Sequence, residues 1–306
     1  MRGLIPADLA SRAAVLSLAA NVVLMVVKIT AGLITDSVAV LSDGIDSATD
    51  VIASGIVYAS VRIGAMPADP RHPYGHGRIE TLAASAQALL IASGGVFILF
   101  SSVRRLLDPP ADIGTSLGLT VMLVAALVNL GVAQYARSVA KMTGSPAIAA
   151  DARHLVTNIV QAGAVFAGLG LVALTDEVIF DALLAFALGL YLLWTAANIL
   201  WSAAGDVMDA GLTPDEVEQI EAAIRIEGDA IAGFHDLRTR RSGQSRHIDF
   251  HLDLPPSMTM AEAHLITDRI EARLRATWPA SVVTIHTEPD DSNASAHGYG
   301  SSRTMP

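Results

Sequence analysis

The chain has 306 residues, of which 52% are hydrophobic and only 16% charged, and its mean hydropathy is +0.48. This composition is too apolar for an ordinary soluble domain and indicates a membrane protein. The net charge of -10 argues against a nucleic-acid partner. The absence of cysteine excludes disulfides and thiolate ligands, so any metal must be held by His, Asp, Glu or Asn.

Six segments are predicted to cross a membrane as helices. Four are stretches without a charged residue, each longer than the ~20 apolar residues that a spanning helix needs. They lie within residues 80–104, 112–137, 153–176 and 181–206. The first span is expected within residues 12–36 and the second within residues 37–58. The first is interrupted only by Lys28, whose ammonium we expect to reach the membrane interface.

The distribution of Lys and Arg predicts the orientation of these spans. Eight such residues lie in the segments that share a side with the two termini, and two lie on the other side. Loops on the cytoplasmic side carry the excess of positive charge. Both termini are therefore expected in the cytoplasm.

The second span is unusual because it carries Asp43, Asp46 and Asp50. A carboxylate near the bilayer centre costs about 2.5–3.5 kcal/mol even on lenient insertion scales. Asp46 and Asp50 share a helix face, and His154 and Asn158 have the same spacing in the fifth span. If the two helices pack side by side, these residues can close a four-ligand shell around one cation. The alternative is that they pair with one another or cap a kink.

A second group of metal-binding residue types lies in the loop after the second span. Asp69, His72 and His76 fall within eight residues, and Pro and Gly residues between them favour fixed turns. These are suitable ligands for a small zinc-like site at the membrane surface. The alternative is a polar loop whose histidines face water.

After Asp206 charged residues become frequent, and a small α+β domain is predicted. Its order is helix, strand, strand, helix, strand, at residues 214–226, 230–240, 246–254, 260–277 and 281–288, with a turn at 242–244. We expect a six-helix transmembrane domain (1–209) and a cytoplasmic metal-binding dimerisation domain (210–289). The tail (290–306) is rich in Ser, Gly and Asn and is expected to be disordered.

Histidine is concentrated in the cytoplasmic domain. Five of the nine fall there: His235, His247, His251, His264 and His286. His251 lies on the polar face of its strand, and His286 shares a face with Glu288. If these strands are neighbours, the side chains form a metal site; the alternative is a set of scattered surface histidines.

These residues resemble the motifs of the cation diffusion facilitator family, and of its bacterial ferrous-iron and zinc efflux type, over nearly the whole chain. The family carries Asp-x-x-x-Asp in the second helix, His-x-x-x-Asp in the fifth and Asp-x-x-His-x-x-x-His-Gly in the loop. The matching residues are Asp46 and Asp50, then His154 with Asn158 in place of the final Asp, then Asp69, His72, His76 and Gly77.

The resemblance implies a lipid-embedded, multi-pass homodimer of the cytoplasmic (inner) membrane. Such a protein is not an enzyme but exports divalent metal in exchange for protons. The cytoplasmic domain would be metallochaperone-like and would sense cytoplasmic metal at a two-ion site. The implied ligands are His235, His251, His264, His286 and Glu288, and an interlock between the halves of the dimer is implied at Arg78 and Asp209.

Asn158 departs from the family motif, and this departure affects which metal ion the site would carry. Zinc tolerates three protein ligands plus water, whereas manganese and iron favour more oxygen donors. We expect zinc or ferrous iron, with manganese, cobalt and cadmium as further candidates. His154 is the expected proton carrier, because the ordinary pKa of an imidazole is about 6.5. Asp151 could replace the missing ligand if the fifth helix extends that far.

Two other functions are compatible with these motifs. A partner subunit could dimerise and sense metal without transporting it, because Asn158 has disabled the pore site. A membrane-anchored zinc hydrolase could instead use the loop residues, with Glu80 as its general base.

Overall fold

The structure is a computed structural model that describes residues 6–34, 38–107, 116–175 and 179–290. They form two compact units that divide between Gly205 and Asp206. The first unit is helical and the second is a small α+β domain, so the predicted fold class is confirmed. Of the predicted tail, residues 291–306 lie outside the described part.

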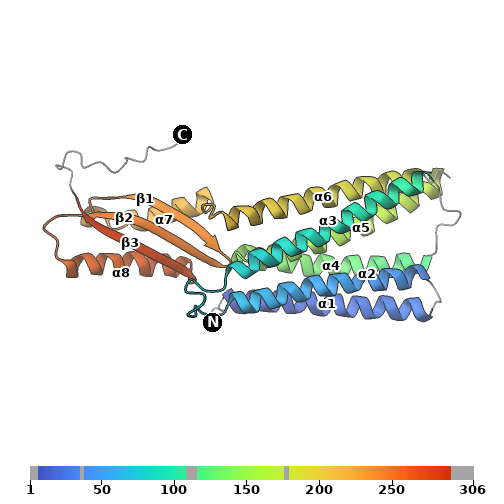
Figure 1. The fold of residues 1–306 in the computed structure, drawn as a ribbon, viewed down its shortest axis with the longest axis horizontal. Coiled ribbons are helices and arrows are strands. Elements are labelled where there is room, and N and C mark those ends of the chain that lie inside the picture. Colours follow the sequence, from blue (N-terminus) through green and yellow to red (C-terminus); the bar gives the residue numbers. More distant parts are fainter. Residues whose placement is uncertain (1–5, 35–37, 108–115, 176–178, 291–306) are drawn as a thin grey trace. The chain divides into compact units, whose positions relative to one another are not determined.

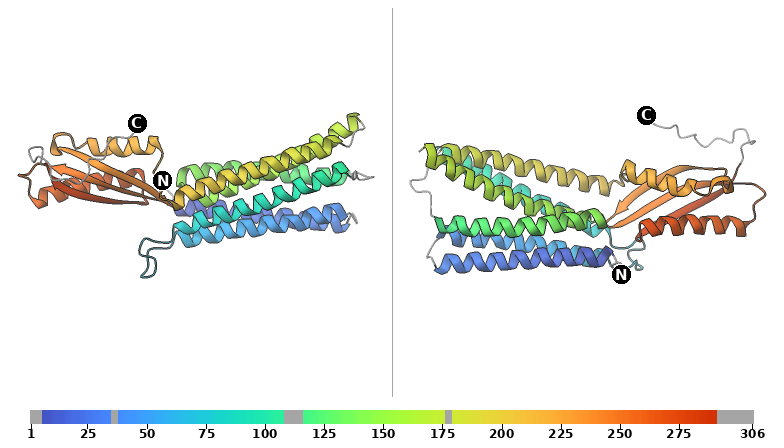
Figure 2. Two further views of the ribbon diagram at one scale, coloured as in Figure 1. Left: turned by 45° about the horizontal axis from the view of Figure 1, so that its top comes forward. Right: turned by 180° about the vertical axis from the view of Figure 1, so that it is seen from behind.

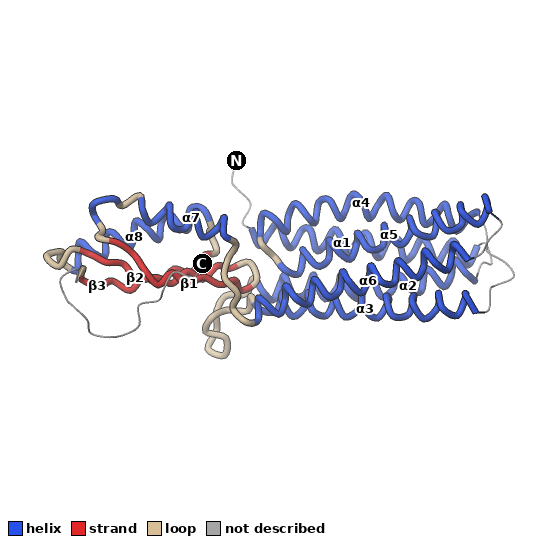
Figure 3. Tube along the Cα trace, turned by 90° about the horizontal axis from the view of Figure 1, so that it is seen from above, coloured by secondary structure: helices blue, strands red, loops and turns tan. Residues whose placement is uncertain are grey.

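Six long helices make up the first unit (Figure 1). They are α1 (Pro6–Ile34), α2 (Val38–Gly64), α3 (Arg78–Leu107), α4 (Ser116–Thr143), α5 (Pro146–Thr175) and α6 (Ile179–Val207). Helix α1 packs along α2 and α4, and α5 packs along α3 and α4. The helices run side by side in all views, with α3 close to α6 (Figures 1 and 3).

Four of these helices, α1, α3, α4 and α6, contain a stretch that is long and apolar enough to cross a membrane, judged on the described residues. Helices α2 and α5 are of similar length but carry the polar residues discussed below. The number of spans and the side on which the termini lie stay predictions.

Close helix contacts in this unit depend on small residues. The buried cluster shared by helices α1 to α5 consists largely of alanine. A Cβ added at Gly189 would lie 2.7 Å from Leu99 Cγ and 3.1 Å from the carbonyl oxygen of Gly95. Such contacts let helix backbones approach one another in a membrane, where apolar burial alone gives little driving force.

Gly44 provides a test of the close approach of α1 and α2. A Cβ at Gly44 would lie 2.9 Å from the backbone nitrogen of Ile29, whereas at Gly55, also in α2, nothing lies within 4 Å. We expect Gly44→Ala to destabilise the full chain by about 1–3 kcal/mol through overpacking. The matched Gly55→Ala should be neutral or stabilising by up to about 1 kcal/mol, because alanine is the better helix former. Thermal unfolding in detergent measures both, and equal midpoints would contradict this packing.

The second unit is a three-stranded sheet covered on one face by two helices (Figure 3). Its elements are α7 (Pro214–Arg225), β1 (Gly233–Ser242), β2 (Ser245–Leu254), α8 (Met260–Thr277) and β3 (Ser281–Pro289). Strand β2 is central, antiparallel to β1 and parallel to β3. Alternate residues of β2, from Ile248 to Leu254, bury against α7 and α8 and leave the opposite face of the sheet polar.

The first strand differs in detail from its prediction. Residues 228–230 form a 3-10 turn, so β1 begins at Gly233. Ser242 pairs with Ser245, and the turn is therefore only Gly243 and Gln244, with Gly243 at φ +59°. Asp236, at φ +51°, lies in a bulge between His235 and Arg238, and the bulge changes the pairing register with β2. The strands are visible from both sides in Figure 2.

Candidate functional site

Helices α2 and α5 bring three of the predicted pore residues together. His154 Nε2 lies 2.9 Å from Asp50 Oδ1, and Asn158 Nδ2 donates to Asp50 Oδ2 at 3.2 Å. Both oxygens of one carboxylate are therefore bonded by the fifth helix. His154 is 7% exposed, so the contact lies inside the bundle.

The fourth predicted ligand precedes Asp50 by one helical turn. The backbone of Asp46 is helical within α2, but its side chain, like that of Asp43, lies outside the described residues. The two pairs of the predicted four-ligand shell are on neighbouring helices, and three of their four side chains are described.

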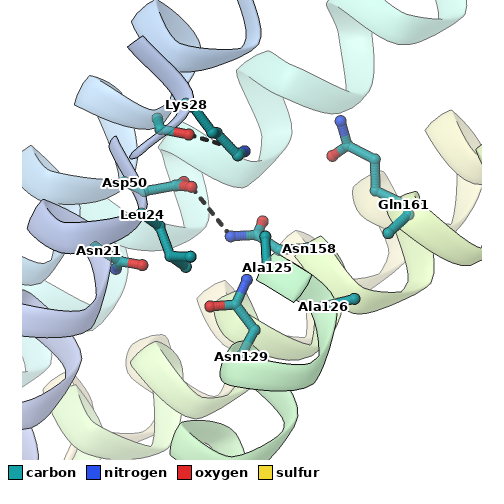
Figure 4. Close-up of a pocket in the computed structure, with 11 residues that line it drawn as sticks. Asn21, Leu24, Lys28, Asp50, Ala125, Ala126, Asn129, Asn158 and Gln161 are labelled. Atoms are coloured by element: carbon teal, nitrogen blue, oxygen red, sulfur yellow. Dashed lines mark hydrogen bonds between the residues drawn. The ribbon is translucent and has the colours of Figure 1, made fainter. Parts of the chain in front are cut away.

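A cavity of about 130 Å³ opens beside this cluster (Figure 4). Its polar lining comes from α1, α2, α4 and α5 and comprises Asn21, Lys28, Ser47, Asp50, Asn129, Asn158 and Gln161. Asn21 and Asn129 were not among the predicted site residues, although asparagine within an apolar span is a usable signal.

Lys28 has polar neighbours that its sequence position did not predict. Its ammonium donates to Ser47 Oγ at 3.0 Å and lines the cavity with Asp50. The apolar pattern of the first span identified the helix correctly, but it carried no information on which face of α1 meets α2.

Asp151 is a buried acid on the same face of α5 as His154 and Asn158. Because α5 begins at Pro146, this residue is helical, as its suggested role required. Its carboxylate, however, accepts hydrogen bonds from Gln87 Nε2 at 3.3 Å and Ser54 Oγ at 3.5 Å. These partners place Asp151 one turn along from the Asp50 cluster, in a separate polar layer, since Ser54 follows Asp50 by four residues.

The loop residues also converge. His72 Nδ1 lies 3.2 Å from Asp69 Oδ1, and His76 Nε2 lies 3.4 Å from Asp69 Oδ2. One ligand atom from each residue lies within 4.8 Å of the others, which is the arrangement that a small metal site needs. The backbone N–H of His72 lowers the pKa of Asp69, so its carboxyl is ionised and ready to bind a cation near neutral pH.

Glu80 is unsuited to the base role that a hydrolase at this loop would need. It is only 1% exposed and accepts a hydrogen bond from Ser145 Oγ. A general base must reach a substrate or its water directly. The structure therefore removes the one candidate base of the hydrolase hypothesis.

In the cytoplasmic unit, three histidines form a row across the sheet. His235 pairs with His251 in β1–β2, and His251 pairs with His286 in β2–β3. Directly opposed residues project to the same face, and the ring centroids are 5.0 Å and 4.8 Å apart. Strands β2 and β3 are therefore neighbours, as a metal site that includes His251 and His286 requires.

Glu288 connects the three histidines. Its Oε1 lies 2.8 Å from His251 Nδ1 and 3.4 Å from His286 Nε2, and its Oε2 lies 3.5 Å from His235 Nε2. Asp253 joins the group through a contact of 3.4 Å to His235 Nε2 and was missed by the sequence analysis. Its position two residues after His251, on the same face of β2, was the available signal.

Three other predicted residues do not join this cluster in the structure. His264, on α8, is exposed and lies 3.6 Å from Asp268. Asp209 lies 3.5 Å from Arg240 of its own unit. Arg78 is the first residue of α3. The structure does not test the ligand role of His264 or the interlock between Arg78 and Asp209.

Comparison with known proteins finds two family models that together match most of the chain. The model described as the cation efflux transmembrane domain matches residues 14–208, and the one described as the cation efflux protein, cytoplasmic domain, matches residues 212–290.

Individual relatives match over nearly their full length. The chain is 34% identical to the cation-efflux pump FieF of Shigella boydii over 281 residues, which is 92% of this chain and 93% of that pump. It is 35% identical to FieF of Pectobacterium atrosepticum, over 92% and 94% of the two chains. Among solved structures, the metal-bound C-terminal domain of the CzcD transporter from Thermotoga maritima is similar over 27% of this chain and 100% of that one, at 22% identity and a TM-score of 0.25.

Proposed function

Because the chain belongs to the cation efflux family, whose members are transporters and not enzymes, we propose that it exports zinc from the cytoplasm in exchange for protons. Efflux of divalent metal is the activity of the family, and the choice of zinc and of protons is our proposal. The observation that carries it is the convergence of His154 and Asn158 on the two oxygens of Asp50.

The donor set favours zinc. Asp46 and Asp50 would supply the charge, His154 a nitrogen and Asn158 a neutral amide oxygen. Zinc accepts four mixed nitrogen and oxygen ligands, whereas manganese requires a larger oxygen shell. Ferrous iron is the second candidate, and cobalt and cadmium belong to the same test.

Proton exchange would use the same contact. Metal and proton compete for the ring nitrogen of His154, so arrival of one releases the other. The metal would enter from the cytoplasm, and rocking of the helices would open the cavity to the far side. In this scheme Asp50 holds His154 in place through Nε2 when no metal bridges them.

The cytoplasmic cluster would act as a metal sensor in a homodimer. His235, His251, His286 and Glu288 would bind metal, with His264 as a further ligand. Binding stabilises a closed pair of cytoplasmic domains only if the ligands are better placed in that state. The loop site at Asp69, His72 and His76 would bind metal at the membrane surface.

The proposed location is the cytoplasmic (inner) membrane, in contact with lipid and with both termini in the cytoplasm. The predicted excess of Lys and Arg on that side supports this orientation. Arg78 and Asp209 are proposed to interlock the protomers, and as solvated charges they would contribute about 0–1 kcal/mol.

Metal flux into proteoliposomes tests the function. Zinc, ferrous iron, manganese, cobalt and cadmium are compared for wild type and Asn158→Asp, with and without an imposed pH gradient. We expect zinc flux by wild type that responds to the gradient. The second candidate function, a non-transporting partner subunit, is motivated by Asn158 itself. It would be favoured by flux that appears only in Asn158→Asp.

The sensor role predicts a strong effect of His251→Gln, because His251 is the middle residue of the histidine row. We expect the zinc affinity of the cytoplasmic domain to fall by about tenfold or more, since even outer-shell changes cost about that much. Titration calorimetry of the full chain, in an Asp50→Asn background that silences the pore site, measures it. His247→Gln, in the same strand but outside the cluster, is the control. Equal losses in both variants would contradict the assigned ligands.

A further inference from the structure

Lys28 places a basic side chain in the proposed transport cavity. It lies on α1, is half-buried, and its Nζ donates to Ser47 Oγ at 3.0 Å. Ser47 is 5% exposed and precedes Asp50 on α2 by three residues, so this hydrogen bond directs the ammonium toward the interior of the bundle. Figure 4 shows Lys28 and Asp50 reaching into the cavity from neighbouring helices.

Among the described lining residues, Asp50 is the formal anion and Lys28 the formal cation, and the remaining polar lining is neutral. Asp46, the second acid of the proposed site, precedes Asp50 by one helical turn, and its side chain lies outside the described residues. Asn158 stands where an acid would make the lining more negative. A lysine on a membrane helix is costly when it faces lipid, and its position beside a carboxylate in a cavity is the usual mark of a function.

We propose that Lys28 is a charge-balancing residue of the transport cycle, whose ammonium compensates Asp50 when the cavity holds no metal. This inference rests on the proposed function of the cavity. In the metal-free state the ammonium stabilises the carboxylate in a low-dielectric interior. In the metal-bound state the same charge repels the divalent ion and favours its release.

The proposal separates two kinds of transport. Net flux requires the carrier to return without metal, which is the step that Lys28 assists. Exchange of zinc for zinc across the membrane returns the carrier loaded and avoids that step. Removing the charge should therefore strengthen zinc binding, slow net flux and spare exchange.

The test compares Lys28→Met, which removes the charge at similar size, with Lys28→Arg, which keeps it. In proteoliposomes we expect Lys28→Met to lower the KM for zinc about tenfold, from the loss of one repulsive unit charge. Its maximal net flux should also fall well below wild type while exchange of labelled zinc persists, and Lys28→Arg should resemble wild type in all three measurements. Lys141→Met, at the exposed end of α4, controls for loss of a lysine elsewhere.

Unchanged KM and net flux in Lys28→Met would overturn the proposal. A lowered KM and net flux in Lys28→Arg as well would also overturn it, because the size of the side chain rather than its charge would then matter. Zinc titration of Lys28→Gln in detergent is the second measurement, since glutamine can keep the hydrogen bond to Ser47. Unaltered affinity there also overturns the inference. Absence of zinc flux in wild type would instead contradict the proposed function.

Discussion

Asp50→Asn is expected to reduce metal flux at least about 100-fold for every metal tested, at the upper end of the loss seen for residues that only support a ligand. The substitution keeps the size of the side chain but removes the charge that meets His154 and Asn158. An amide at this position can still accept the hydrogen bond from Asn158 Nδ2 through its oxygen, so the expected loss comes from the missing charge and the missing second carboxylate oxygen.

Zinc uptake into proteoliposomes measures this effect, with protein amount and reconstitution matched between variants. Asp8→Asn, in the exposed first turn of α1, neutralises an acid outside the cavity and should transport like wild type. If Asp50→Asn retained more than about a tenth of the flux, Asp50 would not be a cargo ligand and the pore site would have to lie elsewhere.

The largest effect on stability is expected at Glu216 in the cytoplasmic domain. Its carboxylate accepts hydrogen bonds from Arg241 at 2.9 Å and from Arg246 at 2.8 Å, and its side chain is only 14% exposed. It also completes the capping box of α7 with Thr213. Glu216→Gln removes the negative charge that two partly buried guanidinium groups share, which should cost about 3 kcal/mol.

The pH dependence of this effect follows from the pKa of Glu216. Burial raises that pKa, but Arg241 and Arg246 outweigh burial, and the net shift is downward. A carboxyl with a lowered folded-state pKa contributes stability above its unfolded pKa, and that contribution disappears as pH falls through the folded value. The difference between wild type and Glu216→Gln should therefore be full at pH 7 and shrink below about pH 4.3, the ordinary Glu pKa.

Urea unfolding of the full chain in detergent measures this difference. Trp278 packs against the core of the cytoplasmic domain and lies over Arg246, so its fluorescence reports on the affected region. Trp194→Phe and Trp201→Phe remove the other two tryptophans. Glu218→Gln, at an exposed position of the same helix, should shift the midpoint little. A pH-independent difference for Glu216→Gln would show that the ion pairs are not its cause.

Much of this molecule follows from short-range information in its sequence. Long uncharged stretches, the alternation from Ile248 to Leu254 and the Thr213 cap predicted the order of the long helices and the strands among the described residues. The ends in the second unit agree within about three residues, whereas α1, α2, α4 and α5 each extend about six or seven residues beyond the predicted span at one end. The bulge at Asp236 and the short turn at Gly243 depend on positive φ angles, and hydrophobic periodicity contains no signal for them. Spacing within one helix also indicated that His154 and Asn158 share a face of α5, and both contact Asp50 in the structure.

Tertiary structure alone decided which side chains meet across elements. A helical pattern identifies a polar face, but the partner of that face depends on how the helices pack. Packing places Lys28 in the same cavity lining as Asp50. It also brings Ser54 and Gln87 within hydrogen-bond distance of Asp151. Similarly, alternation placed Asp253 on a polar face, but strand order and register joined it to His235 and Glu288. The sequence by itself determined the elements and the residue types proposed to bind metal. The long-range pairings, which no local spacing encodes, determined which of those side chains meet in the structure.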